Sequence, residues 1–96
     1  MPTAIWNGVV IADAKKDQIK LIEGNIYFPP GSVNKDYLQA SEKKTICAWK
    51  GVANYYDLVV DGKLNQDAAW TYHAPKDAAK EIADYVAFWK GVEVQR

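Results

Sequence analysis

The chain has 96 residues, of which 49% are hydrophobic and 25% charged, and its 12 basic side chains equal its 12 acidic ones. This composition is typical of one globular domain with a single core, here residues 1–96, and not of a disordered chain. The balanced charge gives no field that would attract nucleic acid or an anionic membrane, so neither is an expected partner.

The single cysteine and the single histidine limit the chemistry further. Cys47 has no partner for an internal disulfide, which favours a reducing, cytoplasmic setting. A structural zinc site usually takes four Cys or His ligands, so we expect no metal. No phosphate loop, nucleophile elbow or repeat is present, and no cofactor is predicted. No apolar run approaches the roughly 20 residues of a membrane span, and the first ten residues lack the features of a secretory signal.

The first third of the chain predicts two β-hairpins. AIWNGVVIA suits two short strands around a tight turn at Asn7-Gly8, and QIKLIEGNIYF repeats the pattern around Gly24-Asn25. The pair Pro29-Pro30 ends the second hairpin, because proline cannot donate to a β-ladder. SVNKDYL then predicts a short helical turn with Ser32 as its N-cap, and SEKK is predicted to be an exposed polar loop.

The longest predicted hairpin joins KTICAWKGVANYYDLVV to KLNQDAAWTYHA through Asp61-Gly62. A three-residue loop with a bulge is one possibility for this turn, and it would change which residues share a face. A two-residue turn is the other possibility. It predicts the following opposed pairs: Val59 with Leu64, Tyr55 with Ala68, Ala53 with Trp70, Gly51 with Tyr72, and Lys50 with His73.

The last third of the chain predicts the only helix. PKDAAKEIADY has apolar residues at helical spacing after Pro75, and VAFW and VEV on either side of Lys90-Gly91 predict the last strands. The whole chain therefore predicts a mainly β (α+β) fold. It has about seven short antiparallel strands, one C-terminal helix and a short helical turn.

Five segments, NGVVIA, YFPPGSV, CAWKGVANYY, AAWTYHAP and AAKEIADYVAF, resemble the bacterial family called domain of unknown function 427 in order and spacing. The resemblance covers nearly the whole chain and implies a β-tent-like topology with a pocket. Similar folds include zinc-carrying domains and methionine sulfoxide reductase B, whose paired cysteines are absent here. Family members are sometimes labelled nucleotidyltransferase-like, yet the chain has no Gly-Ser followed by paired aspartates for two metal ions. Ala48 stands where the family usually has a proline, so the resemblance implies no rigid bend after Cys47.

The aromatic residues of the central hairpin form the main candidate site. They cannot all face one buried side if strand residues alternate, so some must line a surface or a cleft. We expect this cleft to bind an unknown small molecule or to serve an accessory role. Packing in the core and exposure on a solvated face are the competing interpretations. The predicted ligand-binding residues are Trp49, Lys50, Tyr55, Trp70, Tyr72 and His73.

Two alternative functions remain open at this stage. One is an enzyme with Cys47 as nucleophile or redox thiol, Lys50 as electrostatic stabiliser and His73 as acid or base, although a lone cysteine often packs as a small hydrophobe. Asp67 is predicted on the side of Lys50 and His73, either as an ion-pair partner of Lys50 or as a catalytic group. The other alternative is an interaction module that pairs through an edge strand. The sequence specifies neither the ligand nor the oligomeric state.

Overall fold

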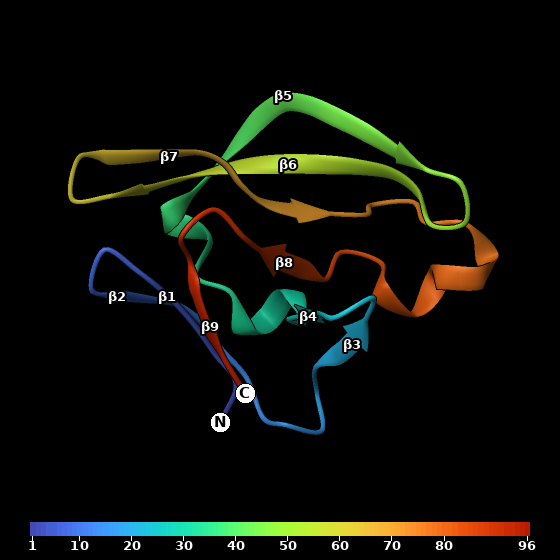
Figure 1. The fold of residues 1–96 in the computed structure, drawn as a ribbon, viewed down its shortest axis with the longest axis horizontal. Helices are drawn as coiled ribbons and strands as arrows, with labels where there is room; N and C mark the ends of the chain where they lie inside the picture. The colour runs from blue at the N-terminus through green and yellow to red at the C-terminus, as the bar shows by residue number, and fades with distance from the viewer.

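The computed structural model describes residues 1–96 as a mainly β fold with little helix (Figure 1). The long four-stranded antiparallel sheet has the order β5 (Leu38–Cys47), β6 (Gly51–Val60), β7 (Lys63–Thr71) and β8 (Val86–Phe88). A second sheet has the order β2 (Val9–Asp13), β1 (Thr3–Trp6) and β9 (Glu93–Gln95), and a third pairs β3 (Lys20–Ile22) with β4 (Asn25–Tyr27). Three short 3-10 helices complete the chain: η1 (Pro30–Ser32), η2 (Lys35–Tyr37) and η3 (Asp77–Ile82). None of these helices has the length and apolar character needed to cross a membrane.

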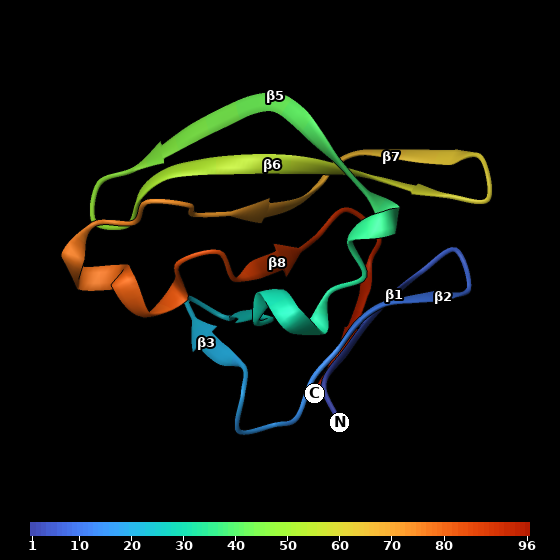
Figure 2. The same cartoon turned by 180° about the vertical axis from the view of Figure 1, so that it is seen from behind.

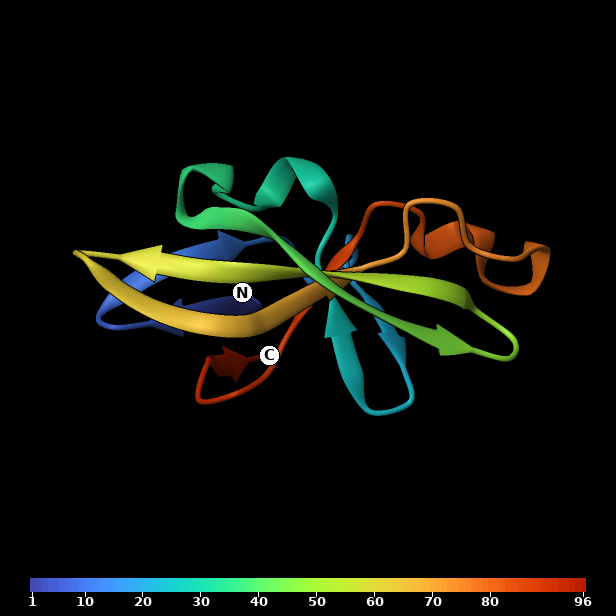
Figure 3. The same ribbon diagram turned by 90° about the horizontal axis from the view of Figure 1, so that it is seen from above.

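The elements form two layers. The hairpin of β5 and β6 and the strand β7 make the upper layer, and the two N-terminal hairpins lie below it with the chain termini close together (Figures 1 and 2). Seen from above, the β1–β2 hairpin lies under one half of the long sheet and the β3–β4 hairpin under the other (Figure 3). The backbones of Phe28 and Val86 exchange two hydrogen bonds of 2.8 and 2.9 Å, which join the end of β4 to β8.

The core is divided into two clusters. The larger one contains Ile11, Phe28, Leu58, Val60 and Phe88 and lies between the long sheet and the first hairpin. The smaller one contains Tyr27, Ala53, Tyr72, Ala79, Ile82 and Ala87, and we call it the tyrosine cluster. Because residues alternate along a strand, neighbours such as Tyr27 and Phe28 enter different clusters.

The first hairpin is confirmed, with its turn at Asn7-Gly8 between β1 and β2. The turn of the second hairpin lies one residue earlier than predicted. Glu23 and Gly24 have positive φ angles of 54° and 80°, and Ile22 already pairs with Asn25. Glu23 is therefore a turn residue and not a strand residue, which sets the direction of its side chain.

Two predictions for the middle of the chain are wrong. SEKK is no loop but part of β5, where a bulge between Ala40 and Lys44 keeps its polar side chains in an extended, largely exposed strand. Ser32 is no N-cap, because its hydroxyl donates to the carbonyl of Pro29 at 2.7 Å. The capping residue is Asn34, whose side chain accepts a hydrogen bond from the backbone N–H of Asp36 at 3.1 Å.

The predicted C-terminal helix is a kinked 3-10 helix, η3. The strand count of about seven is too low because the segment KTICAWKGVANYYDLVV, predicted as one strand, is divided between β5 and β6. Ala79 and Ile82 are both buried, and the helix kinks at Ala79, whose backbone is non-helical (φ −125°, ψ 16°). The helix is short because the chain must return to β7 at once: Ala83 bridges to Tyr72, and the N–H of Asp84 donates to the carbonyl of Tyr72 at 2.9 Å.

The register of the central hairpin is correct near its turn and wrong beyond it. The two-residue turn at Asp61-Gly62 and the pairing of Val59 with Leu64 are confirmed. From Leu58↔Asn65 to Tyr56↔Ala69, however, β6 advances two residues while β7 advances four. This bulge shifts every later pair by two residues, so Tyr55 faces Trp70 and not Ala68. The predicted opposition of Lys50 and His73 is lost as well. The shift moves the two residues out of register, and both lie outside the paired strands, since Lys50 precedes β6 and His73 follows β7.

Asp67 holds the bulge in place. Its φ angle is 57°, its N–H donates to Asp57 Oδ1 at 2.8 Å, and its carboxylate accepts from the Ser41 hydroxyl at 2.5 Å. Its carbonyl also accepts from Trp89 Nε1 at 2.5 Å. Asp67 therefore connects β5, β6 and the residue that follows β8. It forms no ion pair with Lys50, which corrects that interpretation.

We predict that Asp57→Ala destabilises the fold by about 1 to 3 kcal/mol, because the half-buried N–H of Asp67 loses its acceptor. Asp57→Asn keeps an acceptor at the same position and serves as the control, with a smaller loss. Urea denaturation followed by far-UV circular dichroism measures both values. Equal stability of Asp57→Ala and the wild type would show that the bulge does not depend on this bond.

Candidate functional site

An open cleft of about 300 Å³ lies beside the tyrosine cluster. We call it the aromatic cleft. Its lining residues come from β4, β6 and β7 and from positions just outside β6, β7 and β8. They are Asn25, Lys50, Tyr55, Trp70, Tyr72 and Trp89. The register shift in the central hairpin is what makes Tyr55 and Trp70 direct cross-strand partners in this wall.

Three rings of the cleft contact one another. The ring centroids of Tyr55 and Trp70 are 6.4 Å apart, those of Tyr55 and Trp89 6.3 Å, and those of Trp70 and Trp89 5.7 Å. These separations are those of tilted and edge-to-face aromatic pairs, and they leave no space for another ring between them. A ligand would therefore lie against the wall that these rings form.

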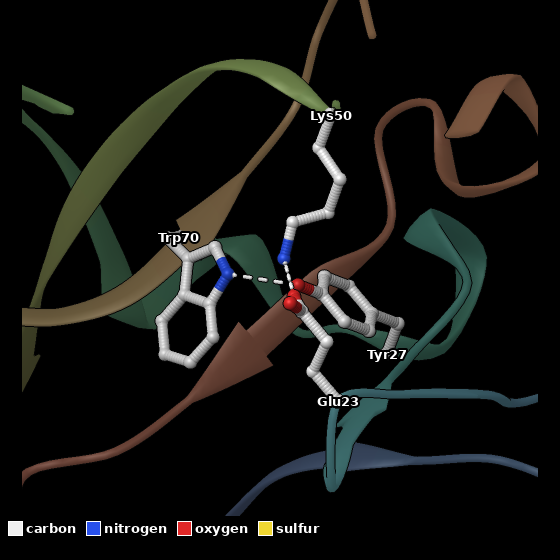
Figure 4. Close-up of polar contacts among 4 residues, drawn as sticks. All are labelled: Glu23, Tyr27, Lys50 and Trp70. Carbon is white, nitrogen blue, oxygen red and sulfur yellow. Dashed lines mark hydrogen bonds and ion pairs between the residues drawn. The ribbon is translucent and has the colours of Figure 1, made fainter. Parts of the chain in front are cut away.

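Both indole N–H groups of the wall are used within the protein. Trp70 Nε1 donates to the hydroxyl of the fully buried Tyr27 at 3.2 Å (Figure 4), and Trp89 Nε1 donates to the carbonyl of Asp67. These bonds fix the orientation of each ring. The rings consequently offer the cleft their apolar surfaces and not their N–H donors.

Lys50 is the buried cation of the cleft. Its side chain is only 7% exposed, and its ammonium contacts the carboxylate of Glu23, which is 52% exposed (Figure 4). Lys50 Nζ also lies 5.4 Å from the ring centroids of both Trp49 and Tyr72. The aromatic faces and the carboxylate together compensate the burial of this charge.

The charges of this pair are stable over the ordinary pH range. Burial by itself lowers the pKa of Lys50. The hydrogen bond with Glu23, then the electrostatic effects of Tyr27, Tyr72 and the Glu23 charge, outweigh burial and raise the pKa above its ordinary value of 10.5. The hydrogen bond from Lys50 lowers the pKa of Glu23 below its ordinary 4.5. Burial raises the pKa of the neighbouring Tyr72, so its phenol remains neutral.

Four of the six predicted ligand-binding residues line the aromatic cleft: Lys50, Tyr55, Trp70 and Tyr72. Trp49 covers the ammonium of Lys50 from outside the lining. Sequence reasoning missed Glu23, Asn25 and Trp89. Glu23 and Asn25 were predicted only as parts of the second hairpin and its turn, and Trp89 was predicted only as a strand residue.

His73 lies in a different cleft of about 250 Å³. Its Nδ1 is 2.8 Å from Asp84 Oδ1, a contact that orients the ring and leaves Nε2 free when the imidazole is neutral. Burial, and then the charge of Asp84, raises the pKa of Tyr56 in the same cleft. The structure thus separates His73 from Lys50. The lining residues are Pro30, Lys35, Leu38, Tyr56, His73, Asp84 and Val86.

Cys47 is half-buried at the end of β5 and packs against the tyrosine cluster. It lines neither the aromatic cleft nor the cleft of His73. Lys50 and His73 are engaged with Glu23 and Asp84, so the three predicted catalytic residues do not share one cleft. No group of three or more His, Cys, Asp or Glu side chains is placed to hold a metal ion.

We predict an acid-dependent loss of stability from the Glu23 carboxylate. Because the folded state lowers the pKa of Glu23, its contribution is fully present above pH 4.5 and is lost as the pH falls through the lowered value. Urea midpoints at neutral pH and at about pH 3 measure this loss. Glu23→Gln should remove this part of the acid sensitivity, whereas Glu93→Gln on β9 should retain it; identical acid responses of all three proteins would contradict the prediction.

The whole-chain comparison agrees with the resemblance of the five segments. A family model described as Domain of unknown function (DUF427), with a nucleotidyltransferase-type short name, matches residues 3–96. A comparison with curated proteins finds no match. Since the matched region omits only the first two residues, the chain belongs to the family of Domain of unknown function DUF427.

Proposed function

We propose that this domain binds a small planar organic molecule in the aromatic cleft. The observation that carries the proposal is the wall of Tyr55, Trp70 and Trp89, whose rings line an open cleft beside a buried lysine. The volume of about 300 Å³ is at the lower end of the range for ligand pockets, which suits a molecule of one or two rings.

The fixed orientation of the wall supports binding. Trp70 and Trp89 are each held by an indole hydrogen bond, and Tyr27 behind them is fully buried. A ligand that stacks on such rings loses little free energy in ordering them, because they are already ordered. Aromatic contact then supplies affinity through buried apolar area and ring geometry.

We infer a β-tent-like topology for the domain on the basis of its layers. The long antiparallel sheet lies over two hairpins that diverge beneath its two halves (Figure 3), and the Phe28–Val86 pairing joins one of them to the sheet. The aromatic cleft lies where that hairpin meets the long sheet, since Asn25 of β4 and Trp70 of β7 both line it.

The alternative of strand pairing with a partner has less support. β5 is an edge strand of the long sheet, but it carries Glu42, Lys43 and Lys44 and is bulged at this point. Charged side chains and bulges are features that protect edge strands from pairing.

We predict that indole binds saturably and shifts the Nε1–H signals of Trp70 and Trp89, but not that of Trp6 on β1, in spectra of the ¹⁵N-labelled protein. Trp89→Ala should weaken binding by about two- to ten-fold, the range of one aromatic contact. Val10→Ala on β2 is the control, because the two side chains are similarly exposed, at 48% and 42%, but only Trp89 lines the cleft. Uniform shifts at all four indoles, or no saturation, would contradict binding in this cleft.

We predict that Cys47 is alkylated by iodoacetamide much more slowly in the native protein than in urea, because it packs against the tyrosine cluster. Mass spectrometry follows the single thiol without interference. A native rate equal to or above that of the unfolded chain would favour the thiol enzyme over the binding domain.

A further inference from the structure

The charge of the aromatic cleft restricts the ligands that it can accept. Lys50 is the only ionised residue in the lining, and its ammonium is paired with the carboxylate of Glu23 from the β3–β4 turn (Figure 4). The low pKa of Glu23 keeps that carboxylate ionised, so the pair itself carries no net charge. The ammoniums of Lys43 and Lys90 lie outside the lining, 5.5 and 5.1 Å from the ring centroids of Tyr55 and Trp89. A ligand thus meets a neutral ion pair and not a free cation.

Lys50 nevertheless retains hydrogen-bonding capacity. An ammonium has three N–H donors: Glu23 accepts one, and the hydroxyl of Tyr72, whose pKa the hydrogen bond with Lys50 acts to lower, is a second acceptor beside it. The rings of Trp49 and Tyr72 beside it attract the charge but are poor acceptors compared with a carbonyl oxygen. An acceptor oxygen on a ligand would therefore satisfy a donor that is otherwise largely withdrawn from water.

Asn25 adds a second polar group to the same lining. It follows the Glu23-Gly24 turn directly, and its side-chain amide takes part in none of the side-chain hydrogen bonds of the protein. An amide offers both a donor and an acceptor. Together, Lys50 and Asn25 match a ligand edge that carries a carbonyl oxygen and an N–H group.

A ligand carboxylate fits this arrangement less well. To reach Lys50 it must either approach the Glu23 carboxylate, where like charges repel at short distance, or displace Glu23 from its ammonium. A neutral carbonyl accepts from Lys50 without either cost. The apolar ring surfaces of Trp70 and Trp89 are available to both ligands, so the contact with Lys50 is where the ion pair distinguishes them.

We infer that the aromatic cleft selects uncharged aromatic carbonyl compounds, carboxamides or lactams, and that Glu23 excludes aromatic carboxylates from it. The inference rests on the proposed function, since it concerns the same cleft. It assigns Glu23 a role in specificity, because the Glu23 carboxylate is already paired with the Lys50 ammonium that an anionic ligand would require.

Three probes with the same ring test the inference: benzamide, benzoate and toluene. Dissociation constants come from the Trp70 and Trp89 indole signals of the ¹⁵N-labelled protein. The wild type should bind benzamide about ten-fold more tightly than benzoate, an effect slightly larger than the repulsion of two like charges at contact in water. Toluene, which has no carbonyl, should bind more weakly than benzamide.

Two variants separate the roles of the ion-pair partners. Glu23→Gln removes the negative charge but keeps an acceptor, so benzoate should bind more tightly than to the wild type and the preference for benzamide should fall or reverse. Lys50→Met removes the donor, so benzamide should lose its advantage over toluene. Glu93→Gln makes the same change of charge on β9, in the sheet of β1 and β2. It should leave the ratios of the three dissociation constants unchanged.

The outcomes distinguish this inference from the proposed function. Wild-type binding of benzoate as tightly as benzamide would overturn the selectivity but leave the cleft as a ligand site. Unchanged benzoate affinity in a folded Glu23→Gln variant would overturn the role of Glu23. If none of the three probes binds, the inference and the proposed function both fail. The wild-type comparison decides the selectivity even if a variant does not fold.

Discussion

The bulge at Asp67 is the constraint on which the arrangement of the cleft depends. Two residues of β6 lie against four of β7, and the left-handed backbone of Asp67 is stabilised by Asp57 and Ser41. The resulting shift places Tyr55 opposite Trp70, and the carbonyl of Asp67 positions the indole of Trp89. One bulge therefore sets both the cross-strand pair and the third ring of the aromatic wall.

The second determinant is the meeting of two hairpins at one lysine. The β3–β4 turn carries Glu23 to the ammonium of Lys50, which lies in the connection between β5 and β6 (Figure 4). A buried ammonium without a carboxylate would be costly, so the pair links the lower layer to the upper one. The same pair leaves Lys50 with its charge compensated, so this lysine is not a free cation in the cleft.

Membership of the DUF427 family agrees with the mainly β structure and with the aromatic cluster, and it carries no reaction with it. The positions of the candidate residues distinguish the thiol enzyme from the ligand-binding domain. Cys47 packs against the tyrosine cluster and His73 is paired with Asp84 in a separate cleft, whereas four of the residues expected to bind a ligand lie together. For these reasons, ligand binding in the aromatic cleft is the function that the geometry supports best.

Local chemistry let the sequence by itself determine the mainly β character, the turns at Asn7-Gly8 and Asp61-Gly62 and the concentration of aromatic residues in the central hairpin. The resemblance of five segments identified the family. Tight turns and strand alternation depend on neighbouring residues, so they can be predicted from a pattern. Only the tertiary structure decided the bulge register, the Lys50–Glu23 pair, the separation of Lys50 from His73 and the 3-10 form of η3. The contacts behind the cleft join residues 26 (Ser41–Asp67), 27 (Glu23–Lys50) and 43 (Tyr27–Trp70) positions apart, and no local pattern encodes such pairs.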